Sequence, residues 1–209
     1  MWRKLLLSFS VITFAFGVLF TSIMRTAAIK YEFGQSSDLG AKVLGEMDVN
    51  IDYFLAYPGK VLPDHPLWPV KVIRDKIWFL MTTNPSKKAE MKLLFADKRL
   101  VSSKELFEKD KPELAFSTLT KAEKYLEEAS AQETQNRKNG LETVEFLKRL
   151  SFASLKHAQV IEEILAMAPE DAKPQIIQIE NYAKNVFETS RNALLEKGET
   201  PPENPFDWR

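Results

Sequence analysis

The chain has 209 residues, of which 44% are apolar and 28% charged, an ordinary composition for a protein with a buried core. Its 29 Lys and Arg are balanced by 29 Asp and Glu, which argues against a nucleic-acid-binding protein, since such proteins carry a basic surplus. The absence of cysteine excludes disulfides, thiolate metal sites and a cysteine nucleophile.

The N-terminal residues predict membrane targeting. Residues 5–24 contain no charged side chain, and a helix of 20 residues spans about 30 Å, the thickness of a bilayer hydrocarbon core. We therefore predict an uncleaved transmembrane signal anchor, with residues 1–4 as a cytoplasmic tail and the rest extracytoplasmic, because a short basic tail usually stays in the cytoplasm. The alternative is a cleaved signal sequence ending at Ala28, which would give a secreted protein.

Two segments of different character lead from this span into the rest of the chain. Residues 25–56 show no sustained period and predict a juxtamembrane linker. Residues 57–69 contain four prolines, each of which fixes its own φ and pushes the preceding residue out of the helical region. This proline segment should therefore be extended and stiff.

The end of the proline segment resembles a helix start. Leu67 and Trp68 come just before the first predicted helical turn. They are expected to pack as a hydrophobic staple on Val72 or Ile73. Asp64 is placed to accept hydrogen bonds from free N–H groups in a turn or near that helix start.

Apolar periodicity predicts the first two helices. The first covers residues 69–83, with apolar side chains at three- and four-residue steps, namely Val70, Ile73, Ile77 and Leu80. The second begins with Asn84 as N-cap and Pro85 as first helical residue, and runs to about residue 110. Its predicted buried stripe consists of Ala89, Leu93, Ala96, Leu100, Ser103 and Phe107. Its predicted polar face carries Lys88, Lys92, Asp97, Lys98, Arg99 and Lys104.

Three more helices follow. One starts at Pro112 and stops at Asn139-Gly140, a left-handed C-terminal cap, with a stripe of Ala115, Leu119, Ala122, Leu126 and Ala129. The next covers residues 141–168, with a stripe of Val144, Leu147, Ser151, Ser154, Ala158, Ile161, Leu165 and Ala168. The last starts near Pro169 or Pro174 and ends at Gly198, with a stripe of Ile176, Ile179, Ala183, Val186, Ser190 and Ala193.

These patterns predict an all-α chain. Short spacers make successive helices antiparallel, so residues 57–198 should form a bundle of about five helices preceded by the proline segment. Residues 199–209 are polar and proline-rich and are predicted to be disordered apart from Phe206 and Trp208.

We predict no catalytic, cofactor-binding or metal-binding residues. The sequence has no phosphate-binding glycine loop and no hydrolase or metalloprotease motif. His157 is expected to be a boundary residue that caps a polar atom, and its possible partner Ser154 lacks a third group. The acidic pairs Glu127-Glu128 and Glu162-Glu163 point about 100° apart on their helices and predict solvated faces.

The second histidine lies in the proline segment. The Asp64-His65 pair would need further ligands to bind zinc, and the chain holds one other histidine. We assign His65 no role from the sequence.

The proline segment and the first two helices together resemble a known family, the domain of unknown function 5667 of bacteria and archaea. The resemblance covers about residues 57–129. It rests on Leu62, Pro63, Asp64, Pro66, Leu67, Trp68 and Lys71, and then on Lys88, Ala89, Glu90, Ala96, Lys98, Arg99 and Leu100. Trp68 stands where the family more often has tyrosine.

The resemblance implies an exported or membrane-anchored helical protein without a known activity. Some relatives are extracytoplasmic portions of membrane-bound anti-sigma factors. Only four residues precede the predicted span in this chain, which weakens a direct signalling role.

Three functions are compatible with these observations. The favoured one is a non-enzymatic interaction or structural component of the cell envelope, whose partners are the membrane and another envelope protein or a second copy, without nucleic acid or cofactor. The alternatives are an envelope hydrolase or metal- or ligand-binding domain, and an extracytoplasmic accessory of a membrane signalling system.

Overall fold

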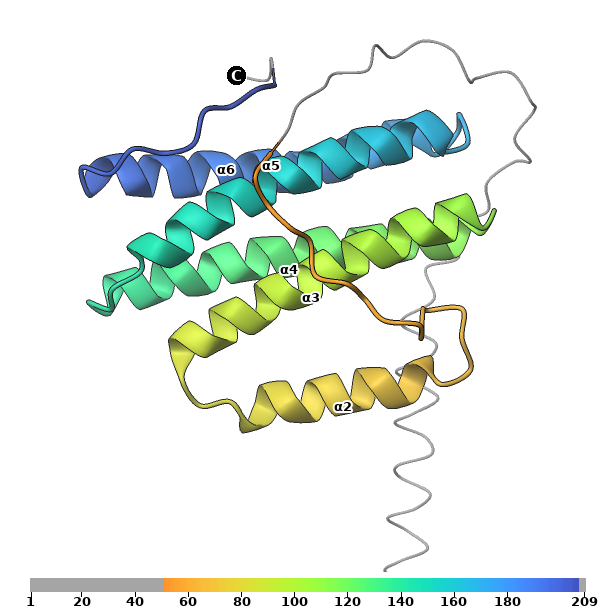
Figure 1. Cartoon of the computed structure of the whole chain (residues 1–209), viewed down its shortest axis with the longest axis horizontal. Helices are drawn as coiled ribbons and strands as arrows, with labels where there is room; N and C mark the ends of the chain where they lie inside the picture. Colours follow the sequence, from red (N-terminus) through yellow and green to blue (C-terminus); the bar gives the residue numbers. More distant parts are fainter. Residues whose placement is uncertain (1–50, 207–209) are drawn as a thin grey trace, which may run out of the picture. The chain divides into compact units, whose positions relative to one another are not determined.

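The computed structural model describes residues 51–206, and the predicted span of residues 5–24 lies outside them. The described residues form five helices and no strand: α2 (Trp68–Met81), α3 (Pro85–Glu108), α4 (Pro112–Lys138), α5 (Val144–Met167) and α6 (Lys173–Glu196) (Figure 1). The all-α prediction is therefore confirmed for this part of the chain. None of these helices is long and apolar enough to cross a bilayer.

The helix boundaries follow the expected start and stop signals. The side chain of Asn84 accepts a hydrogen bond from the N–H of Lys87 at 3.1 Å, and Pro85 is the first residue of α3. The glycines that follow α4 and α6, Gly140 and Gly198, have φ values of +80° and +75°. Glycine adopts this left-handed conformation without the steric cost that a Cβ atom would add.

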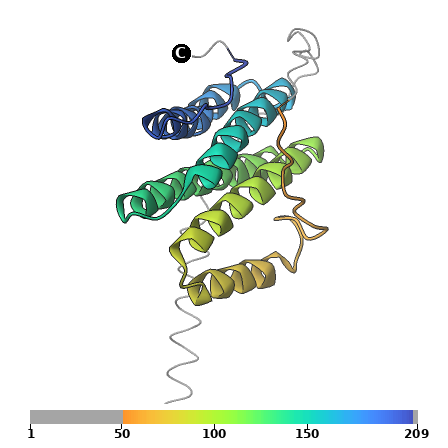
Figure 2. The same ribbon diagram turned by 60° about the vertical axis from the view of Figure 1, so that its left-hand side comes forward.

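Four helices make up the bundle. Successive helices run antiparallel, so α3 and α4 form one hairpin and α5 and α6 form another, and the two hairpins pack on each other (Figures 1 and 2). The predicted stripes of α3, α4 and α6 are buried throughout, and that of α5 is buried except at its half-buried members Val144 and Leu165. Many core positions are alanine, which lets neighbouring helices approach closely. The core between them includes Ala96, Leu126, Ala129, Ala153, Ala158, Ala183 and Phe187.

The first helix differs from its prediction. α2 lies beyond α3, on the side away from α5 and α6 (Figures 1 and 2), and none of its residues is fully buried. Its stripe, expected to face a partner helix, is exposed, with 64% of Val70 and 77% of Leu80 accessible to solvent. The pattern correctly indicates an amphipathic helix, but periodicity alone does not say what covers the apolar face.

Two non-helical segments pack on the bundle. The last residues of the predicted linker are in contact with it, since Ile51 is buried in the same core cluster as Leu150 and Phe187. At the other end, Phe206 is buried in that cluster too. The predicted ordered residue Trp208 lies outside the described residues.

Candidate functional site

Residues 62–68 of the proline segment form two successive turns, so this part is not extended as the sequence predicts. The N–H of His65 donates to the carbonyl of Leu62 at 2.9 Å, and the N–H of Trp68 donates to the carbonyl of His65 at 2.9 Å. Pro63 and Pro66 each occupy the second position of a turn, where the fixed φ of proline fits. His65 closes the first turn and opens the second, and its Nδ1 accepts a hydrogen bond from the N–H of Leu67 at 3.1 Å. His65 therefore has a structural role that the sequence did not reveal.

Two lysines hold the proline segment in place. The ammonium group of Lys71 donates to the carbonyls of Pro58 and Val61 at 2.6 and 3.0 Å and lies 4.9 Å from the centre of the Trp68 ring. Burial lowers the pKa of Lys71 from its ordinary value. The carboxylate of Asp64 accepts from Lys111 at 2.6 Å, and this hydrogen bond lowers the pKa of Asp64.

The packing expected of Leu67 at the start of α2 is not formed. Leu67 is the N-cap of α2, and no side chain caps this helix, so Asp64 does not serve as a cap. Leu67 is more than half exposed. It shares the outward face of α2 with Val70, and therefore it cannot form the predicted staple on Val72 or Ile73.

A buried polar cluster joins three helices at the centre of the bundle. His157 of α5 is completely inaccessible to solvent, and its Nδ1 and Nε2 lie 2.7 Å from Glu123 Oε1 and 3.2 Å from Asp97 Oδ1. Glu123 belongs to α4 and Asp97 to α3. The hydroxyl of Tyr53 donates to the other oxygen of Asp97 at 2.9 Å. We call these four side chains the His157 cluster.

The two carboxylates keep His157 protonated. Burial alone would lower the pKa of His157, but the carboxylates of Glu123 and Asp97 raise it to about 9. Both ring nitrogens then donate hydrogen bonds. Burial and the nearby Asp97 raise the pKa of the Tyr53 phenol, so Tyr53 stays a neutral donor. One oxygen of Glu123, Oε2, is buried without a hydrogen bond among the described residues.

The His157 cluster corrects two predictions. His157 is not a boundary residue, and Asp97 is not on the polar face of its helix, since only 4% of its surface is accessible. The pairing of His157 with Ser154, which the sequence already disfavoured, does not form, because the hydroxyl of Ser154 donates to the carbonyl of Ser151 at 2.8 Å and both nitrogens of His157 are engaged. Within residues 51–206, no group of three or more His, Asp or Glu is arranged to hold a metal ion.

The positions of the charged residues of the His157 cluster in the sequence could have indicated that these residues are buried. Each charged member on a helix is adjacent in the chain to a buried alanine of the predicted stripes: Asp97 follows Ala96, Glu123 follows Ala122, and His157 precedes Ala158. A core-facing surface of a helix is at least 100° wide, so residues beside a stripe position also face the core. The acidic pair Glu127-Glu128, by contrast, is exposed as predicted.

Arg99 is a second buried charge where the sequence predicts an exposed one. Only 9% of its surface is accessible. Its guanidinium carbon lies 4.5 Å from the ring centre of Tyr125 and 5.8 Å from that of Phe95. The covering of this side of α3 by α2 explains the difference, because arginine can lie along apolar surface.

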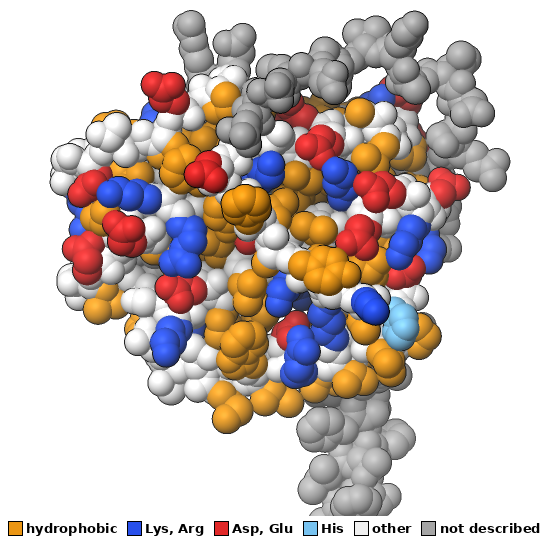
Figure 3. Space-filling model, in the orientation of Figure 1, with side chains coloured by type: hydrophobic (Ala, Val, Ile, Leu, Met, Phe, Trp, Pro, Cys, Tyr) orange, Lys and Arg blue, Asp and Glu red, His pale blue; other side chains and the backbone are white. Residues whose placement is uncertain are grey.

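The outward face of α2 presents a row of exposed apolar side chains. Its exposed apolar side chains are Val70, Ile73, Ile77, Trp78, Leu80 and Met81, with Leu67, Tyr57 and Phe54 beside them in the chain. Figure 3 shows hydrophobic side chains along the edge of the molecule formed by α2, interspersed with Lys and Arg. Contiguous apolar patches of this kind mark interaction surfaces.

The same region is locally basic although the whole chain is neutral. Residues 60–88 contain six basic side chains, Lys60, Lys71, Arg74, Lys76, Lys87 and Lys88. They contain two acidic ones, Asp64 and Asp75. Surface charge of one sign beside an apolar patch favours a partner of the opposite charge.

Comparison with known proteins gives one match. The family model described as Domain of unknown function (DUF5667) matches residues 60–189. The match thus reaches beyond residues 57–129 to include α5 and most of α6. No curated protein and no solved structure matches the chain.

Proposed function

Because the chain belongs to the DUF5667 family, whose description names no activity, we propose a function from its surface chemistry. The protein is a non-enzymatic structural component of the cell envelope. It is held to the membrane by the predicted span of residues 5–24 and lies on the outer leaflet through the exposed face of α2. The observation that carries this proposal is that α2 directs its apolar stripe to solvent while the other four described helices bury theirs.

The composition of α2 supports a lipid surface as its partner. A helix that lies in a membrane interface combines an apolar face that includes aromatic residues with basic residues beside it. The exposed face of α2 contains Trp78, a residue enriched at membrane interfaces. Arg74 and Lys76 are exposed next to this face and can reach anionic headgroups.

A second copy of the chain is a less favourable partner for the exposed face of α2 than an anionic membrane. Packing one α2 against another would bring together two sets of three basic residues and one acidic residue, Lys71, Arg74, Lys76 and Asp75, and like charges at an interface are unfavourable. An anionic leaflet has the opposite charge.

Site-directed spin labelling of the full chain in nanodiscs tests this function, because the chain has no native cysteine. A label at Ile77→Cys reports on the exposed face of α2, and a label at Asn181→Cys, an exposed position on α6, is the matched control. With phosphatidylglycerol in the disc, we expect the Ile77 label to become accessible to dissolved oxygen and inaccessible to an aqueous nickel complex. The Asn181 label should stay aqueous.

Two outcomes would overturn the proposal. If the Ile77 label stays as aqueous as the Asn181 label in anionic discs, α2 does not lie on the membrane. If two labels at Ile77 show dipolar broadening, the face is occupied by a second copy.

A further inference from the structure

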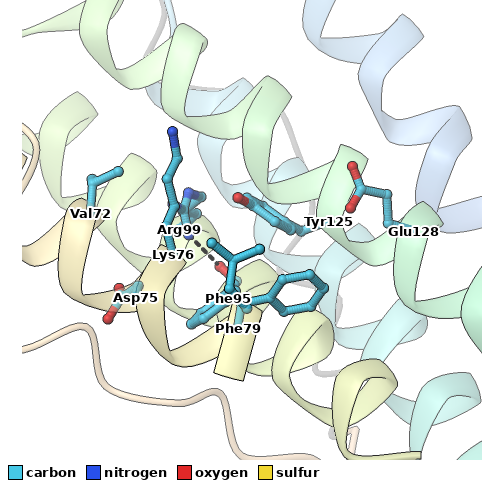
Figure 4. A pocket seen from close by; sticks show the side chains of 9 residues that line it. Val72, Asp75, Lys76, Phe79, Phe95, Arg99, Tyr125 and Glu128 are labelled. Carbon is cyan, nitrogen blue, oxygen red and sulfur yellow. Dashed lines mark hydrogen bonds between the residues drawn. The ribbon is translucent and has the colours of Figure 1, made fainter. Parts of the chain in front are cut away.

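A pocket lies between α2 and the helix pair α3–α4. It has a volume of about 280 Å³. Its walls include Val72, Phe79 and Leu80 of α2 and Phe95 of α3. Figure 4 shows Val72 and Phe79 of α2, Phe95 of α3 and Tyr125 of α4 around a common space. The walls are therefore mostly apolar, as in ligand-binding pockets of small molecules.

A buried cation without an anion partner lines this pocket. Arg99 stacks on Tyr125, and its Nη1 is 3.5 Å from the carbonyl oxygen of Phe95, a long hydrogen bond drawn as a dashed line in Figure 4. Among the described residues, no carboxylate forms an ion pair with Arg99. Burial lowers the pKa of Arg99 from its ordinary value. A buried charge is normally paired, because removing it from water is costly.

The carboxylates near the pocket are already engaged. Asp75 and Glu128 both line it and lie on opposite sides in Figure 4. Asp75 pairs with Arg74 at 2.6 Å, and Glu128 pairs with Lys92 at 3.5 Å. Asp75 favours the charged form of Arg99 at longer range and partly offsets the effect of burial on its pKa, but among the described residues no carboxylate is in contact with the guanidinium of Arg99.

Other cations add to the positive potential. Burial, and to a smaller extent the charge of Arg99, lowers the pKa of Lys121. Lys76 also lines the pocket. A cluster of cations beside apolar walls raises the local concentration of anions.

We propose that this pocket binds a small amphipathic anion, whose single carboxylate or phosphate group pairs with Arg99 while its apolar part packs against Val72, Phe79, Leu80 and Phe95. Arginine is suited to this role because its planar guanidinium donates two parallel hydrogen bonds to a carboxylate or phosphate. The volume corresponds to roughly nine water molecules at about 30 Å³ each, which limits the bound part to a short chain or one ring.

This site does not depend on membrane docking by the outer face of α2, so it is tested without anionic lipid. Full-length protein in phosphatidylcholine nanodiscs is titrated calorimetrically with phenylpropionate, a monoanion with one ring. The neutral phenylpropanamide has the same shape and serves as the control ligand. We expect phenylpropionate to bind and phenylpropanamide to bind about tenfold more weakly or not at all.

Two pairs of variants test whether phenylpropionate binds in this pocket, and the first pair replaces an arginine. Arg99→Gln should weaken phenylpropionate binding about tenfold or more. The matched control Arg149→Gln removes an arginine that also lies over a ring, that of Phe146 at 5.5 Å, but outside the pocket. This control should bind phenylpropionate like the unmodified protein.

The second pair avoids any risk to folding, because Leu80 is largely exposed. Leu80→Glu places a competing carboxylate at the pocket and should weaken phenylpropionate binding, whereas Leu80→Gln should not. Equal binding of acid and amide, absence of binding, or unchanged binding in both Arg99→Gln and Leu80→Glu would overturn the proposal.

A further titration distinguishes a lipid headgroup from a free anion as the natural occupant of the pocket. If phosphatidylglycerol in the disc weakens phenylpropionate binding to the unmodified protein, the natural occupant is a lipid headgroup. If it has no effect, the occupant is a free amphipathic anion.

Discussion

His157 is a positively charged side chain in the centre of the bundle, and it is paired with the carboxylates of Asp97 and Glu123 from two other helices. Such a buried ion pair contributes little net stability compared with apolar residues, but removal of one partner leaves an uncompensated buried charge. The three side chains fix how α3, α4 and α5 meet, because each hydrogen bond requires one relative position of two helices. This role is structural.

The pKa of His157 predicts how stability depends on pH. The folded pKa of about 9 lies above the ordinary histidine pKa of 6.5, so the folded state binds more protons between these two values. The stabilisation is therefore fully present below pH 6.5 and is lost as the pH rises through 9. We expect the free energy of unfolding to fall by up to about 3 kcal/mol over this interval, measured by urea unfolding of the full chain.

A variant isolates the contribution of His157 to this pH dependence. His157→Gln keeps a polar side chain but removes the positive charge, and it should cost about 3–5 kcal/mol because both carboxylates lose their counter-charge. The double variant Glu123→Gln/His157→Gln should regain part of this loss and show no decrease in stability between pH 6.5 and 9. A pH slope in the double variant equal to that of the unmodified protein would assign the slope to other groups.

The helices differ in whether their apolar stripes are buried or exposed. The stripes of α3 to α6 form one core, whereas that of α2 faces solvent. We therefore expect Leu126→Ala, in the core cluster, to lower the free energy of unfolding by about 2–5 kcal/mol. Ile77→Ala on α2 should change it by less than about 0.5 kcal/mol. The comparison uses urea unfolding of both variants, and similar losses would mean that α2 belongs to the core.

The contrast between α2 and the other helices also shows which features of the helices can be predicted from the sequence. Periodicity identified every described helix within a few residues, because capping residues such as Asn84 and Gly140 and the spacing of apolar residues act locally. It did not show that α2 faces outward. That outcome depends on contacts between distant parts of the chain, which no local pattern records.

Buried charges were the other feature that local patterns did not reveal. Asp97 and Arg99 belong by residue type to a polar face, yet both are buried. Each depends on a partner far away in the chain: Asp97 on His157 and Tyr53, and Arg99 on Tyr125. The two turns around His65 were not predicted either, because the prolines of this segment indicated an extended chain.

At the scale of the whole molecule, charge is distributed unevenly. The chain is neutral overall, but the region of α2 and its flanks has three basic residues for each acidic one. This basic region coincides with the exposed apolar face. In the proposed arrangement, the predicted anchor and α2 hold the protein on one leaflet, and the bundle of α3 to α6 faces away from it.

Hydrogen–deuterium exchange of the unmodified full chain tests most directly whether α2 lies on an anionic membrane. Exchange is followed in phosphatidylcholine nanodiscs with and without phosphatidylglycerol. We predict that phosphatidylglycerol slows exchange of the amides of α2 and leaves those of α3 to α6 unchanged, because only α2 would be shielded by lipid. Exchange of α2 at the same rate in both kinds of disc would contradict this.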